Sequence, residues 1–148
     1  FSTQAHGWPI SDCSSEGLKA AIEIEAAAVP GILPIGLPRF RDCVNVILSY
    51  QNTPAHWGTR RILAAGEGGW ATYENTRGPA LLELLNPSEC FGDIVVDYAY
   101  VELTCACITA LSAFRKLDPT HRAPEVSAAI ASGARWIVEA QRADGSWH

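Results

Sequence analysis

The amino-acid sequence predicts an all-α fold, on three observations. Apolar residues recur at helical spacing in four separate segments of the chain. Prolines, glycines and the pairs Asn-Pro and Asp-Pro lie between these segments, where helices are expected to end. The chain has 148 residues, of which 48% are hydrophobic and 18% charged, so it can form one globular domain with a core of its own.

The first two helices are predicted in the N-terminal part of the chain. One follows the stretch SDCSSE and ends before Pro30-Gly31, and the next lies around Val44. Between them, VPGILPIGLPR contains three prolines and is predicted to be an extended connector. The residues at helical spacing are Leu18, Ala21, Ile22 and Ala26 in the first segment, and Val44, Ile47, Leu48 and Gln51 in the second.

Three more helices are predicted further along the chain. Leu81 to Leu85 is a short helix that stops at Asn86-Pro87. A longer helix ends at Asp118-Pro119, and the last one begins at Pro124. The residues on one face of these two long helices are Val101, Cys105, Ile108, Leu111 and Phe114, followed by Val126, Ile130, Ala134, Ile137 and Gln141.

Two of these helices end in the same way, which indicates a weak internal repeat. A helix that ends in Gln51 is followed by Gly68-Gly69-Trp70, and one that ends in Gln141 is followed by Gly145-Ser146-Trp147. The terminal glutamine is expected to bond the free carbonyls of its own helix end and to offer its amide plane to a tryptophan in a glycine turn. The alternative is two ordinary glycine-terminated helices with coincidentally buried tryptophans.

Charge and cysteine content exclude several classes of protein. The net charge is -5, and no Lys/Arg-rich run is present that would neutralise a phosphate backbone, so nucleic acid is not an expected partner. The five cysteines contain no C-x-x-C pair, so neither a disulfide framework nor a metal site is indicated, and a reducing, intracellular compartment is expected. No apolar run approaches the roughly 20 residues that span a bilayer.

The start at Phe1 and the absence of methionine predict a piece of a longer protein.

Four stretches carry a resemblance to a known family: FSTQAHGWPISDCSSEGLKA, GGWATYENTRG, LLELLNPSECFGDIVVDYAYVE and GARWIVEAQRADGSW. They resemble the C-terminal half of the oxidosqualene cyclases, the family of the lanosterol and cycloartenol synthases. The resemblance implies a partial α/α barrel (toroid) over residues 1–148, built from helical hairpins with glutamine-tryptophan motifs. The proline-rich connector lies outside the match, as does the block at about 52–67, which is an atypical insertion.

The resemblance also implies a function. A triterpene cyclase is an isomerase that converts 2,3-oxidosqualene into a tetracyclic sterol precursor by acid-initiated cation cyclisation, without a metal or other cofactor. Such enzymes insert into one leaflet of a membrane, so the endoplasmic reticulum membrane or a lipid droplet is implied. A complete cyclase is several times longer than this chain, so these residues are expected to be inactive by themselves.

Asp12 allows two interpretations. As a short polar residue before CSSEGLKAAI, it is expected to cap a helix, with Glu16 in the first turn. In the family, however, SDCSSE resembles the motif Asp-Cys-Thr-Ala-Glu, whose aspartate protonates the substrate epoxide. Asp12 matches that acid, and Cys13 matches a cysteine whose thiol hydrogen-bonds to it. An epoxide is a weak base, so a buried acid tuned by hydrogen-bond donors suits this chemistry.

The sequence departs from the family at a second cysteine that supports the acid. Where the family has Glu-Cys-Thr, this chain has Glu102-Leu103-Thr104, and leucine cannot donate a hydrogen bond. Cys107 lies one helical turn further along and could compensate if the local geometry shifts. Otherwise Cys105 and Cys107 are small core residues.

The resemblance also assigns residues to the substrate cavity. Phe1 and Tyr73 match aromatic residues that face the developing cation, which aromatic faces stabilise by about 2 kcal/mol each when desolvated. Ile10 and Ile94 match apolar positions near the acid and at the neck of the substrate channel. The alternative for all four is ordinary core packing.

Two other functions stay open at the level of sequence. A non-catalytic, degenerate helical remnant, or a half-barrel that depends on a partner, would explain Leu103 and the block at about 52–67, which is either a surface loop or translated intron. A carbohydrate-active α/α-barrel enzyme would need two carboxylates across a cleft. The candidate carboxylates are Glu74, Glu83, Glu89, Asp93, Asp97 and Glu102.

Overall fold

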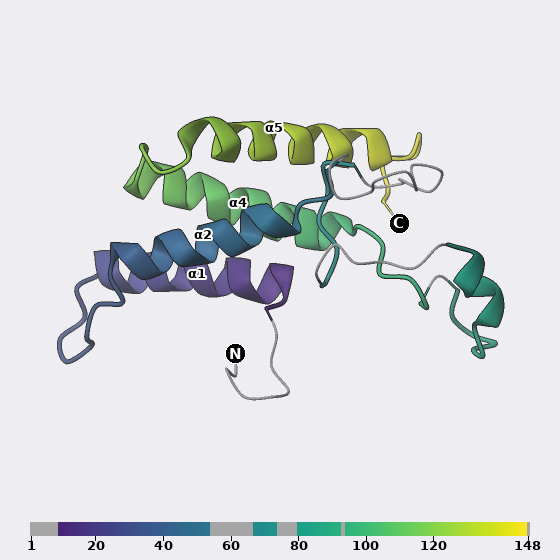
Figure 1. Ribbon diagram of the computed structural model, residues 1–148, viewed down its shortest axis with the longest axis horizontal. Helices are drawn as coiled ribbons and strands as arrows, with labels where there is room; N and C mark the ends of the chain where they lie inside the picture. Colours follow the sequence, from purple (N-terminus) through teal and green to yellow (C-terminus); the bar gives the residue numbers. More distant parts are fainter. Residues whose placement is uncertain (1–8, 54–66, 74–79, 93, 148) are drawn as a thin grey trace.

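Figure 1 shows the computed structural model of the protein, which describes residues 9–53, 67–73, 80–92 and 94–147. These residues form four α-helices, one 3-10 helix and no strand, which confirms the all-α prediction. In this part of the chain no helix is both long enough and apolar enough to cross a membrane. The elements are α1 (Ser11–Ala26), α2 (Leu37–Tyr50), η2 (Ala80–Leu85), α4 (Val101–Leu117) and α5 (Ala123–Ala140).

The long helices form two antiparallel hairpins that lie side by side (Figure 1). The first hairpin is α1 with α2, and the second is α4 with α5. α4 lies in the middle and packs mainly against α1 and α5, while α2 contacts the other three. α1 and α4, the first helices of the two hairpins, run in the same direction. The second hairpin therefore repeats the orientation of the first.

The hydrophobic core lies where the two hairpins meet. Its residues come from all four long helices and from Trp70, which lies in the segment between the hairpins. Burial of a large apolar side chain is worth about 1.5–3 kcal/mol, so this interface is the main source of stability. The core residues are Leu18, Phe40, Val44, Ile47, Trp70, Cys107, Ala110, Leu111, Phe114, Val126 and Ala129.

The connector between α1 and α2 is shorter than the sequence predicts. α2 already begins at Leu37, inside the stretch expected to be extended. Gly36 turns the chain with a φ of 86°, a value that glycine adopts readily. Pro38 then occupies the first turn of the helix, where its missing N–H is not needed. This proline therefore starts a helix instead of extending the connector.

A polar network fixes the corner between α4 and α5 to α2. Asp118 is buried at the end of α4, and its carboxylate accepts hydrogen bonds from Arg41 Nε and the Thr120 hydroxyl, both at 2.8 Å. These bonds lower the pKa of Asp118 to about 2, and the bond from Arg41 contributes most. The sequence identifies this aspartate only as part of a helix stop. The structure shows that it also links the two hairpins.

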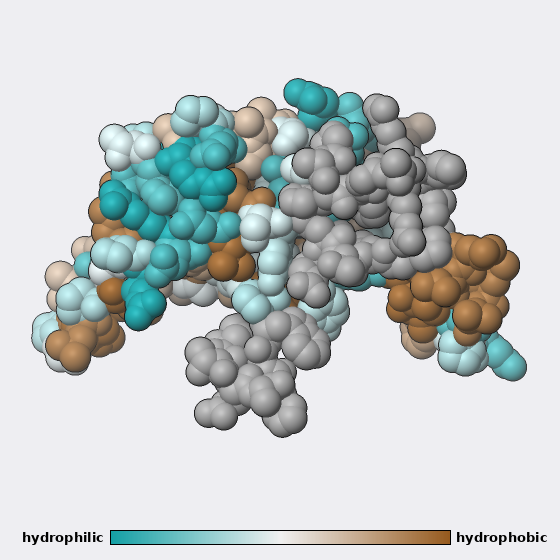
Figure 2. Space-filling model, viewed as in Figure 1, coloured by the Kyte–Doolittle hydropathy of each residue, from teal (hydrophilic) through white to brown (hydrophobic). Residues whose placement is uncertain are grey.

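Apolar side chains also gather on the surface around η2 (Figure 2). Leu81 is 70% exposed, Leu84 80% and Leu85 73%, and Phe91 nearby is 69% exposed. These residues lie apart from the core between the hairpins (Figure 1).

Candidate functional site

Gln51, the residue that follows α2, ties this helix end to α5. Its buried side-chain amide lies 2.8 Å from the carbonyl oxygen of Gly68, 3.0 Å from that of Ala129 and 2.8 Å from the hydroxyl oxygen of Ser132. The first contact fixes the turn before Trp70, and the other two fix α5. One side chain therefore joins the two hairpins.

Trp70 completes this arrangement. Its fully buried indole donates a hydrogen bond from Nε1 to the carbonyl oxygen of Ile47, in the last turn of α2, at 2.8 Å. The backbone of Gln51 also pairs with that of Trp70 in an isolated antiparallel bridge. We call residues 51–52 and 68–70 the Gln51 unit.

The same hydrogen bonds occur at the end of α5. The Gln141 amide donates to the carbonyl oxygen of Gly145 at 3.0 Å, and the indole of Trp147 donates to that of Ile137 at 2.9 Å. In each case the tryptophan bonds the residue four positions before the glutamine. We call residues 141–142 and 145–147 the Gln141 unit.

The partners differ from those that the sequence predicts. The glutamine was expected to bond the carbonyls of its own helix end. In the structure the tryptophan indole bonds that carbonyl, and the glutamine amide bonds the glycine of the turn. The physical requirement is the same, since a carbonyl at a helix end needs a donor from outside the helix.

Two glycines permit close packing around Trp70. A Cβ atom on Gly133 would lie 2.8 Å from the Trp70 ring and 2.8 Å from the Ile108 side chain. A Cβ atom on Gly68 would lie 2.8 Å from the carbonyl oxygen of Ser132. All three distances are shorter than van der Waals contact, so the approach of α5 to the Gln51 unit depends on these glycines.

Trp70 also connects the Gln51 unit to the start of α4. Its backbone N–H donates to the Thr104 hydroxyl at 3.0 Å, and its carbonyl accepts from the Tyr100 N–H at 3.0 Å. Thr104 is fully buried. It is the threonine of Glu102-Leu103-Thr104, the stretch that was matched to the family motif Glu-Cys-Thr, and its hydroxyl bonds the Trp70 backbone.

The segment directly after Trp70 contacts the start of α1. The carbonyl of Thr72 accepts a hydrogen bond from the Ser11 N–H at 3.0 Å. The carboxylate of Asp97 accepts from the N–H of Thr72 at 3.1 Å and from that of Tyr73 at 2.8 Å. Segments far apart in the sequence therefore meet beside the candidate acid, Asp12.

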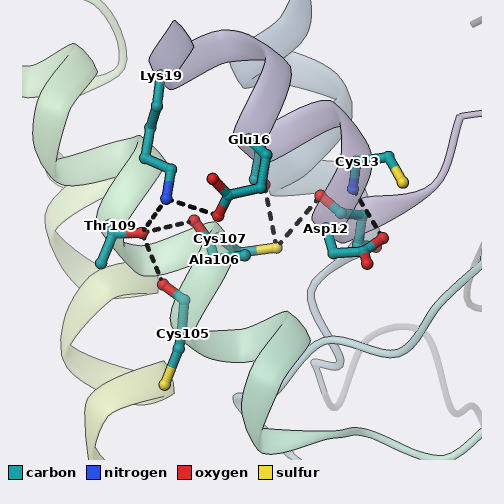
Figure 3. A network of polar contacts seen from close by, with 10 residues as sticks. Asp12, Cys13, Glu16, Lys19, Cys105, Ala106, Cys107 and Thr109 are labelled. Atoms are coloured by element: carbon teal, nitrogen blue, oxygen red, sulfur yellow. Dashed lines mark hydrogen bonds and ion pairs between the residues drawn. The ribbon is translucent and has the colours of Figure 1, made fainter.

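Asp12 lies in the first turn of α1 and is half-buried. The prediction that it caps the helix is wrong by position, because Ile10 is the N-cap residue and makes no side-chain cap bond. The Asp12 carboxylate instead accepts a hydrogen bond from the backbone N–H of Cys13 at 2.7 Å (Figure 3). An acid in the first turn still interacts favourably with the helix dipole.

The thiol of Cys13 is a neutral group beside this acid. Burial raises the pKa of this thiol, and the nearby negative charge of Asp12 raises it further. A thiol that stays protonated can donate a hydrogen bond, which is what the family resemblance requires at this position.

Cys107 does not replace the donor that is missing at Leu103. It is fully buried, and its thiol donates to the carbonyl of Ser11 at 3.7 Å and accepts from the Ser15 hydroxyl at 3.3 Å. Burial raises the pKa of this thiol to about 12. Its single hydrogen is thus used by the α1 backbone, so in this structure Cys107 does not donate to the Asp12 carboxylate.

The expected cavity residues lie near the surface of the described part of the chain. Tyr73 is 41% exposed and Ile94 is 56% exposed in this part of the chain. Ile10 is half-buried at the start of α1. Phe1 lies outside the described residues.

The acidic residues considered for a carbohydrate-active enzyme include two that hold turns. Glu83 accepts hydrogen bonds from the N–H groups of Val95 at 3.1 Å and Val96 at 2.7 Å. Asp97 holds Thr72 and Tyr73 in the same way, a role that the sequence analysis missed. The available signal is an isolated acid within the apolar run IVVDYAYV, where a charge needs partners. Glu74 and Asp93 lie outside the described residues.

Along its whole length the chain is similar to parts of cycloartenol and lanosterol synthases. No protein-family model matches it. It is 51% identical over 148 residues to the cycloartenol synthase of Dictyostelium discoideum. The aligned region is 99% of this chain and 19% of that protein. It is 44% identical over 147 residues to human lanosterol synthase, covering 99% of this chain and 18% of that protein. A terpene cyclase/mutase of Arthrinium sp is 36% identical over 149 residues, 100% of this chain and 19% of the relative.

The chain therefore belongs to the oxidosqualene cyclase family, the family of the cycloartenol and lanosterol synthases. It spans about a fifth of the length of the curated relatives that it matches, 19% of the Dictyostelium protein.

Proposed function

We propose that this chain is the acid-bearing part of a triterpene cyclase that converts 2,3-oxidosqualene into a tetracyclic sterol precursor. The observation that carries the proposal is the similarity to cycloartenol and lanosterol synthases along the whole chain, at 51% and 44% identity. The half-buried aspartate in the first turn of α1, with a protonated thiol next to it, supports the same function.

In this mechanism Asp12 transfers its proton to the epoxide oxygen. The carbon–oxygen bond then breaks, and the carbocation is attacked in turn by the double bonds of the folded polyene. Cys13 stabilises the carboxylate that Asp12 leaves behind, since a hydrogen bond to an anion is stronger than one to a neutral acceptor. Phe1 and Tyr73 stabilise the cation with their rings, while Ile10 and Ile94 line the cavity and channel. No metal or organic cofactor takes part.

The same proposal makes the two hairpins successive units of an α/α barrel. The adjacent first helices α1 and α4 run in the same direction, as successive hairpins of a curved array do. The shared hydrogen bonds of the Gln51 and Gln141 units support their assignment as repeated motifs that brace such a barrel.

We further propose that the protein attaches to one leaflet of the endoplasmic reticulum membrane or of a lipid droplet. The exposed leucines of η2 support contact with a lipid surface, because contiguous apolar surface is unusual on a soluble protein. Flotation with phosphatidylcholine vesicles tests this attachment. Recovery of the protein in the dense fraction, away from the vesicles, would contradict it.

A second candidate is a non-catalytic helical remnant, or a half-barrel that depends on a partner. Leu103 favours it, because the acid then lacks one donor and the Cys107 thiol is engaged elsewhere. Under this alternative, Asp12 has only the local role that its contact with the Cys13 N–H describes.

Turnover of radiolabelled 2,3-oxidosqualene distinguishes the two candidates. The protein is isolated in the length that its source cells make, and products are identified by mass spectrometry. We expect a tetracyclic alcohol, and a loss of about 10²–10⁴-fold in rate for Asp12→Asn, as for removal of a general acid. Asp42→Asn, at an exposed aspartate of α2, is the matched control and should keep full activity. Absence of product from both wild type and Leu103→Cys would support the remnant.

A further inference from the structure

Asp97 lies at the junction between the Gln51 unit and the candidate site. Its two carboxylate oxygens accept from the N–H groups of consecutive residues, Thr72 at 3.1 Å and Tyr73 at 2.8 Å. Hydrogen bonds to a charged acceptor are about twice as strong as neutral ones. The carboxylate therefore fixes the direction of the chain at Tyr73.

The other side of Thr72 is fixed as well. Its carbonyl accepts from the N–H of Ser11, the residue directly before Asp12. The backbone of Thr72 is thus bonded to Asp97 through its N–H group and to α1 through its carbonyl group. Thr72 and Ser11 are hydrogen-bonded to each other, Tyr73 follows Thr72 and Asp12 follows Ser11. The distance between Tyr73 and Asp12 is therefore constrained by this hydrogen bond and by those to Asp97.

Core burial does not fix the ring of Tyr73. The residue is 41% exposed, in contrast to Trp70, which lies three positions earlier and is fully buried. The backbone contacts with Asp97 are therefore one source of positional information for Tyr73.

The segment that carries Asp97 is itself held in place. Glu83 accepts from the N–H groups of Val95 and Val96, directly before Asp97. On the other side, Tyr100 donates to the carbonyl of Trp70. Asp97 therefore sits on a backbone with contacts on both sides, which allows it to position its partner.

We propose that Asp97 is a positioning residue for cyclisation, which holds Tyr73 at a fixed place relative to Asp12 so that the tyrosine ring meets the developing cation. The inference rests on the proposed cyclase function and assigns Asp97 no contact with substrate. Its chemical consequence concerns the fate of the cation. A cation that is less well stabilised loses a proton earlier and is released as a partly cyclised alcohol.

The test compares the product mixtures of variants of the protein in the length that its source cells make. Asp97→Asn keeps the shape of the side chain but offers one acceptor oxygen where two N–H groups need one each. We expect the ratio of partly cyclised to tetracyclic alcohols from 2,3-oxidosqualene to rise about tenfold, with little change in KM. Asp97→Glu keeps both acceptor oxygens and should move the ratio back toward wild type.

The ratio of products does not depend on how much of the variant folds, so partial misfolding does not imitate the expected result. Asp144→Asn is the matched control, because Asp144 also accepts a backbone N–H in a turn, from Ser146 at 3.0 Å, but lies next to the Gln141 unit and away from Tyr73. This control should leave the ratio unchanged. An unchanged ratio in Asp97→Asn, with an active wild type, would overturn the inference and leave the proposed function standing. An inactive wild type would overturn both.

Discussion

The Gln51 and Gln141 units have the same hydrogen bonds but different surroundings. Trp70 is fully buried and Gln51 is 5% exposed, whereas Trp147 is 43% exposed and Gln141 lies on the surface. The Gln51 amide also contacts α5, while in the described part of the chain the Gln141 amide bonds only the glycine of its own turn.

The difference separates what local sequence determines from what packing determines. A glutamine at a helix end, followed by Gly-x-Trp, is sufficient for the local bonds in both units. Burial of the tryptophan needs a second hairpin with a glycine, Gly133, at the contact. Single hydrogen bonds contribute about 1 kcal/mol net, but a buried tryptophan contributes several times more. The two units should therefore differ in stability far more than in geometry.

The largest difference is expected for the tryptophans. Trp70→Ala should lower the free energy of unfolding by about 3–5 kcal/mol, because it leaves a large cavity in the core. Trp147→Ala should lower it by about 1 kcal/mol or less, since that ring is 43% exposed. Urea unfolding followed by circular dichroism measures both. Equal losses would contradict the view that only the Gln51 unit is packed into a core.

The turn glycines sharpen the comparison, because both have positive φ angles, 98° at Gly68 and 87° at Gly145. Alanine at either position brings the same backbone strain, about 1–2 kcal/mol. Only Gly68→Ala also places a Cβ atom 2.8 Å from the Ser132 carbonyl oxygen. We therefore expect it to cost about 1–3 kcal/mol more than Gly145→Ala in urea unfolding. If the two variants lose the same free energy of unfolding, α5 moves away from the added Cβ atom at no cost, which would contradict the expectation.

The glutamines should differ for a polar reason. Gln51→Leu removes the donor for buried acceptors on two segments and should cost about 1–3 kcal/mol in the free energy of unfolding. Gln141→Leu should stay within about 0.5 kcal/mol, as for most surface changes. Thermal and urea unfolding check both values. If Gln141→Leu costs as much as Gln51→Leu, the local bonds dominate and not the contacts to α5.

The smallest effect concerns pH. Hydrogen bonds from the Ser146 hydroxyl and then its backbone N–H lower the pKa of Asp144, next to the Gln141 unit. Because the folded-state pKa is lowered, this stabilisation is present above the unfolded value of about 4 and is lost as pH falls below it. The indole N–H signal of Trp147 in NMR spectra should therefore shift on acidification, and Asp144→Asn should abolish the shift. An identical shift at Trp70 would contradict a local origin.

The sequence could predict the helices because their apolar residues repeat with the helical period. Its choice of buried face was less accurate on α5, where Val126, Ala129 and Gly133 are buried and Ala134 is exposed. Small residues face the interface there because Trp70 approaches closely. Hydrophobic periodicity cannot show such an approach, since the ring comes from a distant segment.

The candidate site could be predicted only in part for a similar reason. Asp12 and Cys13 follow from resemblance to a motif, yet the start of α1 at Ser11 depends on a bond from the Ser11 N–H to Thr72. Asp97 acts through backbone groups of Thr72 and Tyr73, which have no signature in the sequence. Contacts between distant segments therefore account for most of what the sequence missed.

Hydrogen exchange of the two indole N–H groups, measured on residues 1–148, tests the central claim: in this part of the chain the Gln51 unit is packed against a second hairpin and holds the segment leading to Tyr73, while the Gln141 unit has only the local bonds. The Trp70 indole should exchange only when the protein opens widely, because it is fully buried and bonded to Ile47. The Trp147 indole should exchange much faster despite its bond to Ile137. Similar protection of both would contradict the claim.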